Sequence, residues 1–339
     1  MPEITRARMN ELPELSLERW EPTKETLHLW TQIVGKVRLA ANPPQNHWWH
    51  VALYVDPRGL TSRRLRTEGD DFDVSFDFVA HELVVRTSRG EVVSFALADG
   101  LSVAAFYARL STLLDELGIE VETKPEPYGL PTTTPFAADT EHASYDREAI
   151  DRFWRALRWS DWTLQDFAGW FSGKTSPVHF FWHGFDLAVT RFSGRRAPEL
   201  PEADPVTREA YSHEVISFGF WPGDPKVRMP AFYSYTAPEP AGLAEKPLRP
   251  EAASWRQPYG SSHLALLPYD EVRSAANPRR TLLEFLESAY EAGAARPAGT
   301  RRTCAPAGFR PAPFADPQAR PSISASSSSP SSRLAAPTI

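Results

Sequence analysis

The sequence contains a single cysteine, Cys304, among its 339 residues. One cysteine cannot form a disulfide within the chain, and it cannot supply the ligands of a cysteine-based zinc finger or an iron–sulfur cluster. So low a cysteine content fits a reducing compartment. The first twenty residues also lack the continuous apolar segment of a signal peptide, so we expect a cytoplasmic protein.

Long apolar runs are absent as well. No stretch of the sequence approaches the roughly 18 consecutive apolar residues of a membrane-spanning helix, so the sequence predicts no membrane association. The net charge is −6, and the segment 296–339 holds many arginines but only one acidic residue, Asp316. The rest of the chain is therefore more acidic than the net charge indicates. Such a chain is poorly suited to bind phosphate backbones, and we expect no nucleic-acid partner.

The segment 296–339 is rich in proline, serine, alanine and arginine and has few large apolar residues. It cannot bury enough surface to offset the entropy of ordering, so the composition predicts a disordered tail. An alternative hypothesis is a frameshift in a GC-rich gene, because the composition changes abruptly. An in-frame tail of this kind in several related genes would contradict that hypothesis.

The remaining sequence is rich in aromatic residues, with 11 tryptophans, and its apolar positions follow regular spacings. Steps of three and four residues predict helices over 24–39, 101–117, 146–172 and 278–291. Alternation and aromatic content predict strands over 47–55, 71–79, 83–86, 92–97, 178–183, 185–192, 211–220 and 230–236. Gly35-Lys36 and Gly173-Lys174 lack the frame of a phosphate loop and are interpreted as helix ends.

The order of helix, strands and helix occurs twice along the chain. This order predicts an α+β fold of two related helix–sheet–helix halves, with mostly antiparallel sheets packed into one compact body. The chain is predicted to comprise, in order, an N-terminal extension 1–19, a first half 20–121, a Pro/Thr-rich linker 122–143, a second half 144–295 and the tail 296–339. A cleft is expected where the two halves meet.

Several long motifs resemble a known family. NHWWHV, SPVHFFW, FDLAVTRFSGRRAP, EAYSHEV and FWPG are similar to motifs of bacterial proteins about 300 residues long that are catalogued only as a domain of unknown function. The resemblance covers the chain from Trp20 to Ala292. It implies membership of that family, and it implies no activity, cofactor or catalytic residue.

Histidines within the aromatic motifs are the first candidates for a site. The candidate catalytic residues are His179, His213, Glu214 and Asp186. Imidazole and carboxylate groups suit a zinc or iron site, so His179 and His213 are also candidate metal ligands. His47 and His50 would point to opposite faces of a straight strand, and they cannot share an ion there. The structural alternative is that these histidines pack among aromatic rings and donate to backbone carbonyls.

The arginines that follow are candidates for binding an anion. Arg191 shares a strand face with two apolar residues and points into the core or the cleft, where Asp186 or Glu214 could pair with it. The functional alternative is that Arg191 and Arg195 bind a carboxylate or phosphate of a small molecule. Aromatic side chains would line such a pocket, so the set of candidate ligand-binding residues comprises Arg191, Arg195, Trp48, His50 and Trp182.

Two classes of function remain open. The first is a cytosolic small-molecule-binding protein or enzyme with a cleft of His, Arg and aromatic residues between its halves, and an anionic small molecule as partner. The second is a non-catalytic interaction or structural module whose aromatic and arginine motifs form the core. The sequence indicates no reaction type, no cofactor and no oligomeric state.

Overall fold

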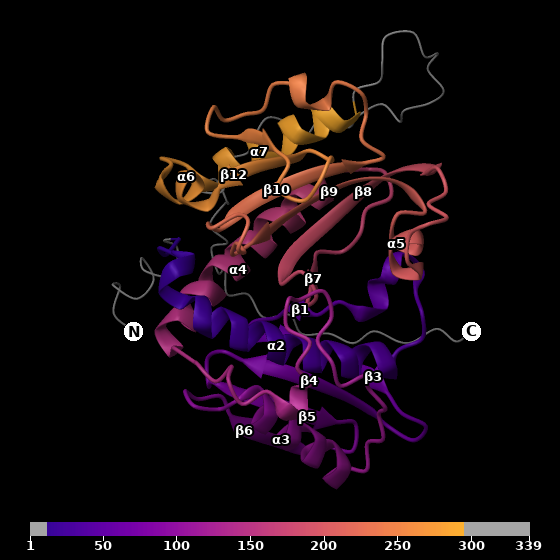
Figure 1. Cartoon of the computed structure of the whole chain (residues 1–339), viewed down its shortest axis with the longest axis vertical. Helices are drawn as coiled ribbons and strands as arrows, with labels where there is room; N and C mark the ends of the chain where they lie inside the picture. Colours follow the sequence, from indigo (N-terminus) through magenta and orange to yellow (C-terminus); the bar gives the residue numbers. More distant parts are fainter. Residues whose placement is uncertain (1–11, 295–339) are drawn as a thin grey trace, which may run out of the picture.

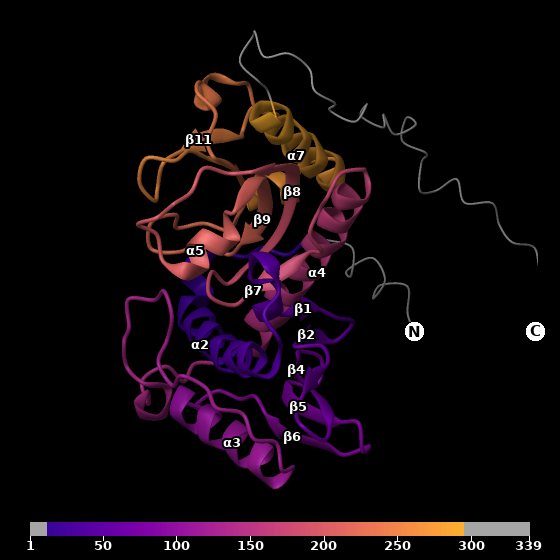
Figure 2. The same cartoon turned by 90° about the vertical axis from the view of Figure 1, so that its right-hand side faces the viewer.

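The computed structural model of the protein describes residues 12–294. Within this part, the chain forms two six-stranded sheets in which every pairing between strands is antiparallel. The two sheets follow one another along the longest axis of the molecule, and helices lie against both (Figures 1 and 2). The predicted α+β fold with antiparallel sheets is therefore confirmed.

The first half contains the following elements in chain order: α2 (Leu17–Ala41), η1 (Asn46–Val51), β1 (Tyr54–Val55), β2 (Gly59–Thr61), β3 (Leu65–Arg66), β4 (Asp71–Asp77), β5 (Glu82–Thr87), β6 (Val92–Ala96), α3 (Val103–Glu116) and η2 (Phe136–Ala138). The strand order is β1-β2-β4-β5-β6, with β3 also paired to β4. The alternating pattern predicted over 71–79 forms β4, at the centre of this sheet.

The second half contains α4 (Arg147–Gly169), β7 (His179–Phe181), β8 (Asp186–Arg196), α5 (Pro205–Ala210), β9 (His213–Trp221), β10 (Ala231–Ala237), η3 (Leu243–Glu245), β11 (Ser254–Arg256), β12 (Leu264–Pro268), α6 (Tyr269–Ser274) and α7 (Pro278–Ala294). Its strand order is β11-β12-β10-β9-β8-β7. Helix–sheet–helix order thus occurs in both halves, while their relatedness and exact boundaries stay predictions. The predicted tail lies outside the described residues.

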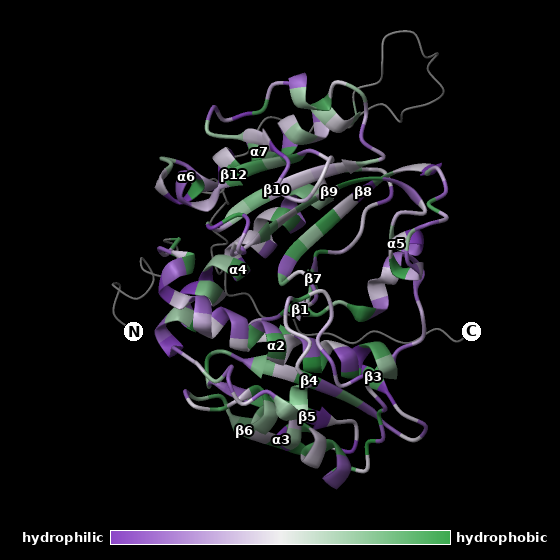
Figure 3. Cartoon of the chain, in the orientation of Figure 1, coloured by the Kyte–Doolittle hydropathy of each residue, from purple (hydrophilic) through white to green (hydrophobic). Residues whose placement is uncertain are grey.

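The second sheet has two different faces. Helices α4 and α7 lie along one side of it, and α5 lies on the other side (Figure 2). Leu187, Val189, Phe218 and Phe232 point toward α4 and α7, and the hydrophobic part of β8 lies in the first half of that strand (Figure 3). The opposite face carries Asp186, Ala188, Thr190, Gly219, Trp221, Tyr233 and Tyr235, and we call it the tyrosine face.

Two sequence-based predictions are wrong. Residues 47–55 do not form one strand, because His47 and Trp48 have left-handed backbone angles (φ 57° and 59°) within η1, and pairing begins only near β1. Gly35 does not end a helix, since α2 continues to Ala41.

None of the helices within residues 12–294 combines the length and apolar composition needed to cross a bilayer.

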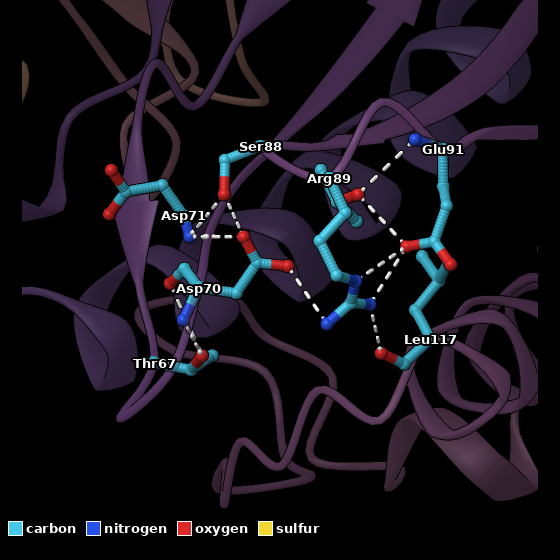
Figure 4. Close-up of polar contacts among 8 residues, drawn as sticks. Thr67, Asp70, Asp71, Ser88, Arg89, Glu91 and Leu117 are labelled. Atoms are coloured by element: carbon cyan, nitrogen blue, oxygen red, sulfur yellow. Dashed lines mark hydrogen bonds and ion pairs between the residues drawn. The ribbon is translucent and has the colours of Figure 1, made fainter.

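The turn that joins β5 to β6, residues 88–90, ties the first sheet to α3 (Figure 4). Arg89 in this turn pairs with Asp70 at 3.0 Å and with Glu91 at 2.8 Å. Its Nη2 also donates to the carbonyl of Leu117, 2.7 Å away, just after α3. A cation at this end of a helix interacts favourably with the helix dipole, so one side chain fixes both hairpin and helix.

The two halves are joined by backbone and side-chain contacts. Leu53 and Phe180 exchange both of their backbone hydrogen bonds at 2.9 Å, which connects the start of β1 to the edge strand β7 of the second sheet. Beside this junction, the buried indole of Trp182 donates to the carbonyl of Val51 at 2.8 Å and packs against Gly35 of α2.

Replacing Gly35 by alanine should destabilise the protein. The new Cβ would lie 2.2 Å from Cδ1 of Trp182, so the indole or the helix must shift. We expect a loss of about 1–3 kcal/mol in the free energy of unfolding, measured by urea denaturation. Gly169→Ala is the control, because a Cβ there meets nothing within 4 Å. Equal stability of the two variants would contradict the close packing of α2 on Trp182.

Candidate functional site

The tyrosine face carries an aspartate that is bound by a tyrosine two strands away. Tyr233 on β10 pairs in register with Gly219 on β9, and a Cβ at Gly219 would lie only 2.4 Å from the Tyr233 ring. Glycine at this position lets the ring lie flat across β9. The Tyr233 hydroxyl thereby reaches β8, where it donates to Oδ2 of Asp186.

The Asp186 carboxyl is strongly desolvated but remains accessible. Burial raises its pKa from 3.8 to about 6, although the hydrogen bond from Tyr233 opposes this change. Its side chain is only partly buried, and it forms no ion pair with any of residues 12–294. A desolvated carboxyl without a cationic partner favours contact with a hydrogen-bond donor.

Two further tyrosines lie close to Asp186 and Tyr233. The hydroxyls of Tyr211 and Tyr235 are 3.0 Å apart, and the ring of Tyr235 stacks on that of Tyr233 with 6.2 Å between centroids. Burial raises the pKa of both Tyr211 and Tyr235, yet both side chains keep accessible surface. We call Asp186, Tyr211, Tyr233 and Tyr235 together the carboxyl–tyrosine site.

The turn between β7 and β8 lies just before Asp186 and contacts helix α2. His183 in this turn is exposed. The backbone carbonyl of His183 lies 3.2 Å from Nε2 of His28 on α2, which donates to it. This hydrogen bond connects the turn before β8, in the second half, to α2 of the first half.

The predicted histidines lie in a row of rings along the same interface. The ring row runs through His213, His47, Trp49, His179 and Tyr54, and successive centroids are 5.5, 5.6, 5.6 and 5.5 Å apart. The left-handed turn at His47 and Trp48 makes this possible, because it directs Trp49 toward the second sheet.

His47 is held as a neutral imidazole. Its Nδ1 donates to the carbonyl of Ala210 at 3.2 Å, which leaves Nε2 as the acceptor for Nζ of Lys174 at 3.5 Å. Burial lowers the pKa of His47, and the nearby Lys174 lowers it further. His50 faces elsewhere: its Nδ1 accepts from the backbone of Gln45 at 3.1 Å. The arrangement of His47 matches the structural alternative, whereas His50 packs on Trp48 and accepts, rather than donates, a backbone hydrogen bond.

No metal centre is formed in the part of the chain that the structure describes. There, no group of three or more His, Cys, Asp or Glu side chains is placed to hold an ion, so neither His179 nor His213 has the partners of a metal ligand. His179 is 1% exposed, burial lowers its pKa to about 3, and its Nε2 has no hydrogen-bond partner within residues 12–294.

Arg191 points away from the tyrosine face, into the core. Its guanidinium lies 3.6 Å from the ring centroid of Phe167, and the rings of Phe171, Phe218 and Tyr290 surround it at 4.8, 5.8 and 4.7 Å. Its Nη2 donates to the Phe167 carbonyl at 2.7 Å near the end of α4. Burial lowers its pKa to about 10, and the side chain is 4% exposed.

The ion pairs predicted for Arg191 are not made. Asp186 binds Tyr233 on the opposite face, and Glu214 binds Arg195 and also accepts from Ser193 at 2.7 Å. The hydrogen bond from Arg195 lowers the pKa of Glu214, so this carboxylate is ionised. The Glu214–Arg195 pair lies at the surface, where it contributes little to stability.

The aromatic residues predicted to line a ligand pocket do not lie together in the structure. Trp182 is buried in the junction of the halves, and Trp48 stacks on His50 with centroids 5.1 Å apart. Only Asp186, of the predicted residues, lies in the carboxyl–tyrosine site. Sequence reasoning missed the three tyrosines. The alternation in AFYSYTA places Tyr233 and Tyr235 on one strand face, and this was the available signal.

A cavity elsewhere is a weaker candidate. It measures about 160 Å³ and lies at the start of α2, between Glu14, Arg19, Trp20 and Arg152. Arg19 pairs with Glu14 at 3.1 Å and Arg152 with Glu148 at 3.8 Å. Its arginines are therefore already paired with carboxylates, and the cavity offers no group in need of a ligand.

The fold and the site define an α+β protein with two antiparallel sheets and, on the second sheet, a desolvated carboxyl group that forms no ion pair within residues 12–294. The chain belongs to the family described as "Family of unknown function (DUF5996)", whose model matches residues 12–304. The predicted membership in a family of unknown function is thus confirmed. No curated protein and no solved structure matches the chain.

Replacing Arg191 by alanine should destabilise the fold. The change removes a charge-assisted hydrogen bond to α4 and the contacts with four aromatic rings, so we expect a loss of at least about 2 kcal/mol in the free energy of unfolding. Arg195→Ala, at the surface, should cost less than about 1 kcal/mol in the same urea denaturation. An Arg191→Ala protein as stable as the Arg195→Ala control would contradict a structural role for Arg191.

Proposed function

We propose that the protein is a cytosolic small-molecule-binding protein and that its ligand binds at the carboxyl–tyrosine site. The observation that carries the proposal is Asp186: a desolvated carboxyl with one tyrosine donor, no cationic partner among the described residues, and accessible surface. A buried carboxyl without a cation is costly for folding alone, and a ligand that donates hydrogen bonds to it would offset this cost.

The surrounding groups define the kind of ligand. Tyrosine hydroxyls and a carboxyl suit hydroxyl or amino groups, while the rings of Tyr233, Tyr235 and the buried Trp221 suit an apolar body. A pKa of about 6 also lets Asp186 exchange a proton near neutral pH, as general acids and bases do. A catalytic role of Asp186 would therefore take place at the same site.

The alternative of an interaction or structural module is favoured for two motifs only. Arg191 is enclosed by aromatic rings of the core, and Trp182 joins the halves. The contacts of both residues within the fold account for their positions. The position of Asp186 has no such structural explanation. A tyrosine–asparagine pair or a purely apolar contact at the same place would avoid the free-energy cost of desolvating a carboxyl.

Native mass spectrometry of the gently purified full-length chain tests the proposal. We expect a stoichiometric extra mass on the wild-type protein and on the control Asp115→Asn, whose side chain is exposed on α3, but not on Asp186→Asn. An extra mass retained by Asp186→Asn would place the ligand elsewhere. If the wild-type protein has the bare mass, and no hydroxyl or amino compound in a thermal-shift screen distinguishes it from Asp186→Asn, the proposal fails.

The stability of the protein should depend on pH through Asp186. Its pKa is raised from 3.8 to about 6, so between these values the folded protein keeps a proton that the unfolded chain has released. The contribution of this carboxyl to the free energy of unfolding therefore falls as the pH rises through that range, and it is constant above it.

Asp186→Asn removes this dependence. Urea denaturation at pH values of about 4.5 and about 7.5 should show that the variant gains stability relative to the wild-type protein at the higher pH. Asp161→Asn serves as a comparison, because burial raises the pKa of Asp161 to about 6 as well, outside the site. A stability difference between wild type and Asp186→Asn that is the same at both pH values would contradict the raised pKa.

A further inference from the structure

A pair of arginines around Tyr54 is not explained by the proposed function. We infer that Arg38, Arg63 and Tyr54, with His179 beside them, form a second binding site, which takes an oxyanion such as a phosphate or carboxylate group. We call these residues the arginine–tyrosine site. The inference stands independently of the carboxyl–tyrosine site, since it involves other residues and the opposite charge.

Arg38 is a buried cation without a counterion. Its side chain on α2 is 6% exposed, and burial lowers its pKa. One guanidinium nitrogen donates to the carbonyl of Ser62, but Nε has no hydrogen-bond partner within residues 12–294. A buried guanidinium is costly unless its charge and its donors are satisfied, and a carbonyl supplies no negative charge.

Arg63 is held over the same tyrosine by a strained loop. Its guanidinium carbon lies 3.4 Å from the Tyr54 ring centroid, and that of Arg38 lies 5.3 Å from it. The backbone of Arg63 is left-handed (φ 54°), which is unfavourable for a residue with a Cβ. Hydrogen bonds of its neighbours fix this conformation: Arg63 N donates to Thr61 Oγ1 at 2.9 Å, and Ser62 Oγ donates to the Arg63 carbonyl at 2.8 Å.

Neither arginine forms an ion pair with any of the described residues. Asp161 on α4 is a carboxyl whose pKa responds to Arg63. Its Oδ2 accepts from Gln165 at 2.6 Å, however, and Asp161 and Arg63 do not come within ion-pairing distance. The two guanidinium groups therefore leave a local excess of positive charge.

His179 adds a neutral donor to this excess. Its ring meets the Tyr54 ring edge-on, with centroids 5.5 Å apart, and its Nε2 is one of the buried atoms without a partner in the described chain. Arg38 and Arg63 both help to keep the imidazole uncharged, since they lower its pKa after burial has done so. Guanidinium donors with a neutral N–H donor match the several acceptor oxygens of a phosphate or carboxylate.

Thermal unfolding of the full-length chain with inorganic phosphate, sodium acetate and sodium chloride at equal ionic strength tests the inference. We expect phosphate or acetate to raise the midpoint of unfolding above the value in chloride. A response to phosphate alone assigns a phosphoryl ligand, and a response to acetate as well assigns the broader carboxylate class. No response beyond that to chloride would overturn the inference.

Arg63→Gln distinguishes this site from general anion effects. The side chain of Arg63 is exposed, so its loss leaves the core intact, and we expect at least about tenfold weaker binding of the anion. Arg64→Gln is the matched control, because the adjacent Arg64 is also exposed and pairs with Asp71 at 3.6 Å instead. Equal anion responses of wild type, Arg64→Gln and Arg63→Gln would overturn the assignment.

Discussion

The pairing of Leu53 with Phe180 is the constraint on which the rest of the structure depends. It attaches the start of the first sheet to the edge of the second, and every group at the interface takes its position from it. The segment just before Leu53 is η1, which carries the centre of the ring row, and the residue just after it is Tyr54. Beyond Phe180 come the turn with His183 and then Asp186. Both candidate sites are therefore placed by two hydrogen bonds of the backbone.

Three cations of the structure, Arg191, Arg63 and Lys174, lie against aromatic rings rather than in ion pairs with residues 12–294. Arg191 lies among four rings, Arg63 lies flat on Tyr54, and Lys174 lies 4.8 Å from the Phe192 ring. Rings stabilise a cation through their quadrupole without neutralising it. Such a cation stays available for an anion if its donors are accessible, as at Arg63, and becomes purely structural if they are enclosed, as at Arg191. Accessibility thus separates the two arginines, which look alike in sequence.

Much of the fold could be predicted from local patterns, because periodic apolar residues dominate it. The face of α4 with Ile150, Phe153 and Leu157 and the alternation in β4 were sufficient. The strand expected over 47–55 failed because tertiary contacts outweigh local preference there: the backbone of His47 donates to Glu209 at 3.3 Å and its ring binds Ala210, both in the second half. The short β11 and β12 carried too little periodicity to be found.

The site was harder to predict, because its partners come from distant parts of the chain. Asp186 was found within a long motif, but Tyr233 lies two strands away, and its reach depends on the missing side chain of Gly219. The orientation of Arg191 toward apolar neighbours was foreseen, whereas its aromatic surroundings from α4 and α7 were not. No pattern in the sequence indicates that Arg38 and Arg63 both contact Tyr54.

Tyr233 also has a mechanical consequence. Its backbone belongs to β10, its ring crosses β9 over Gly219, and its hydroxyl ends on β8, so one side chain spans three strands. Side-chain contacts across strands add to the ladder hydrogen bonds in holding the register in which the strands pair. Tyr233 therefore acts as a diagonal brace against shear in the middle of the sheet, and protonation or ligation of Asp186 changes the anchor of that brace.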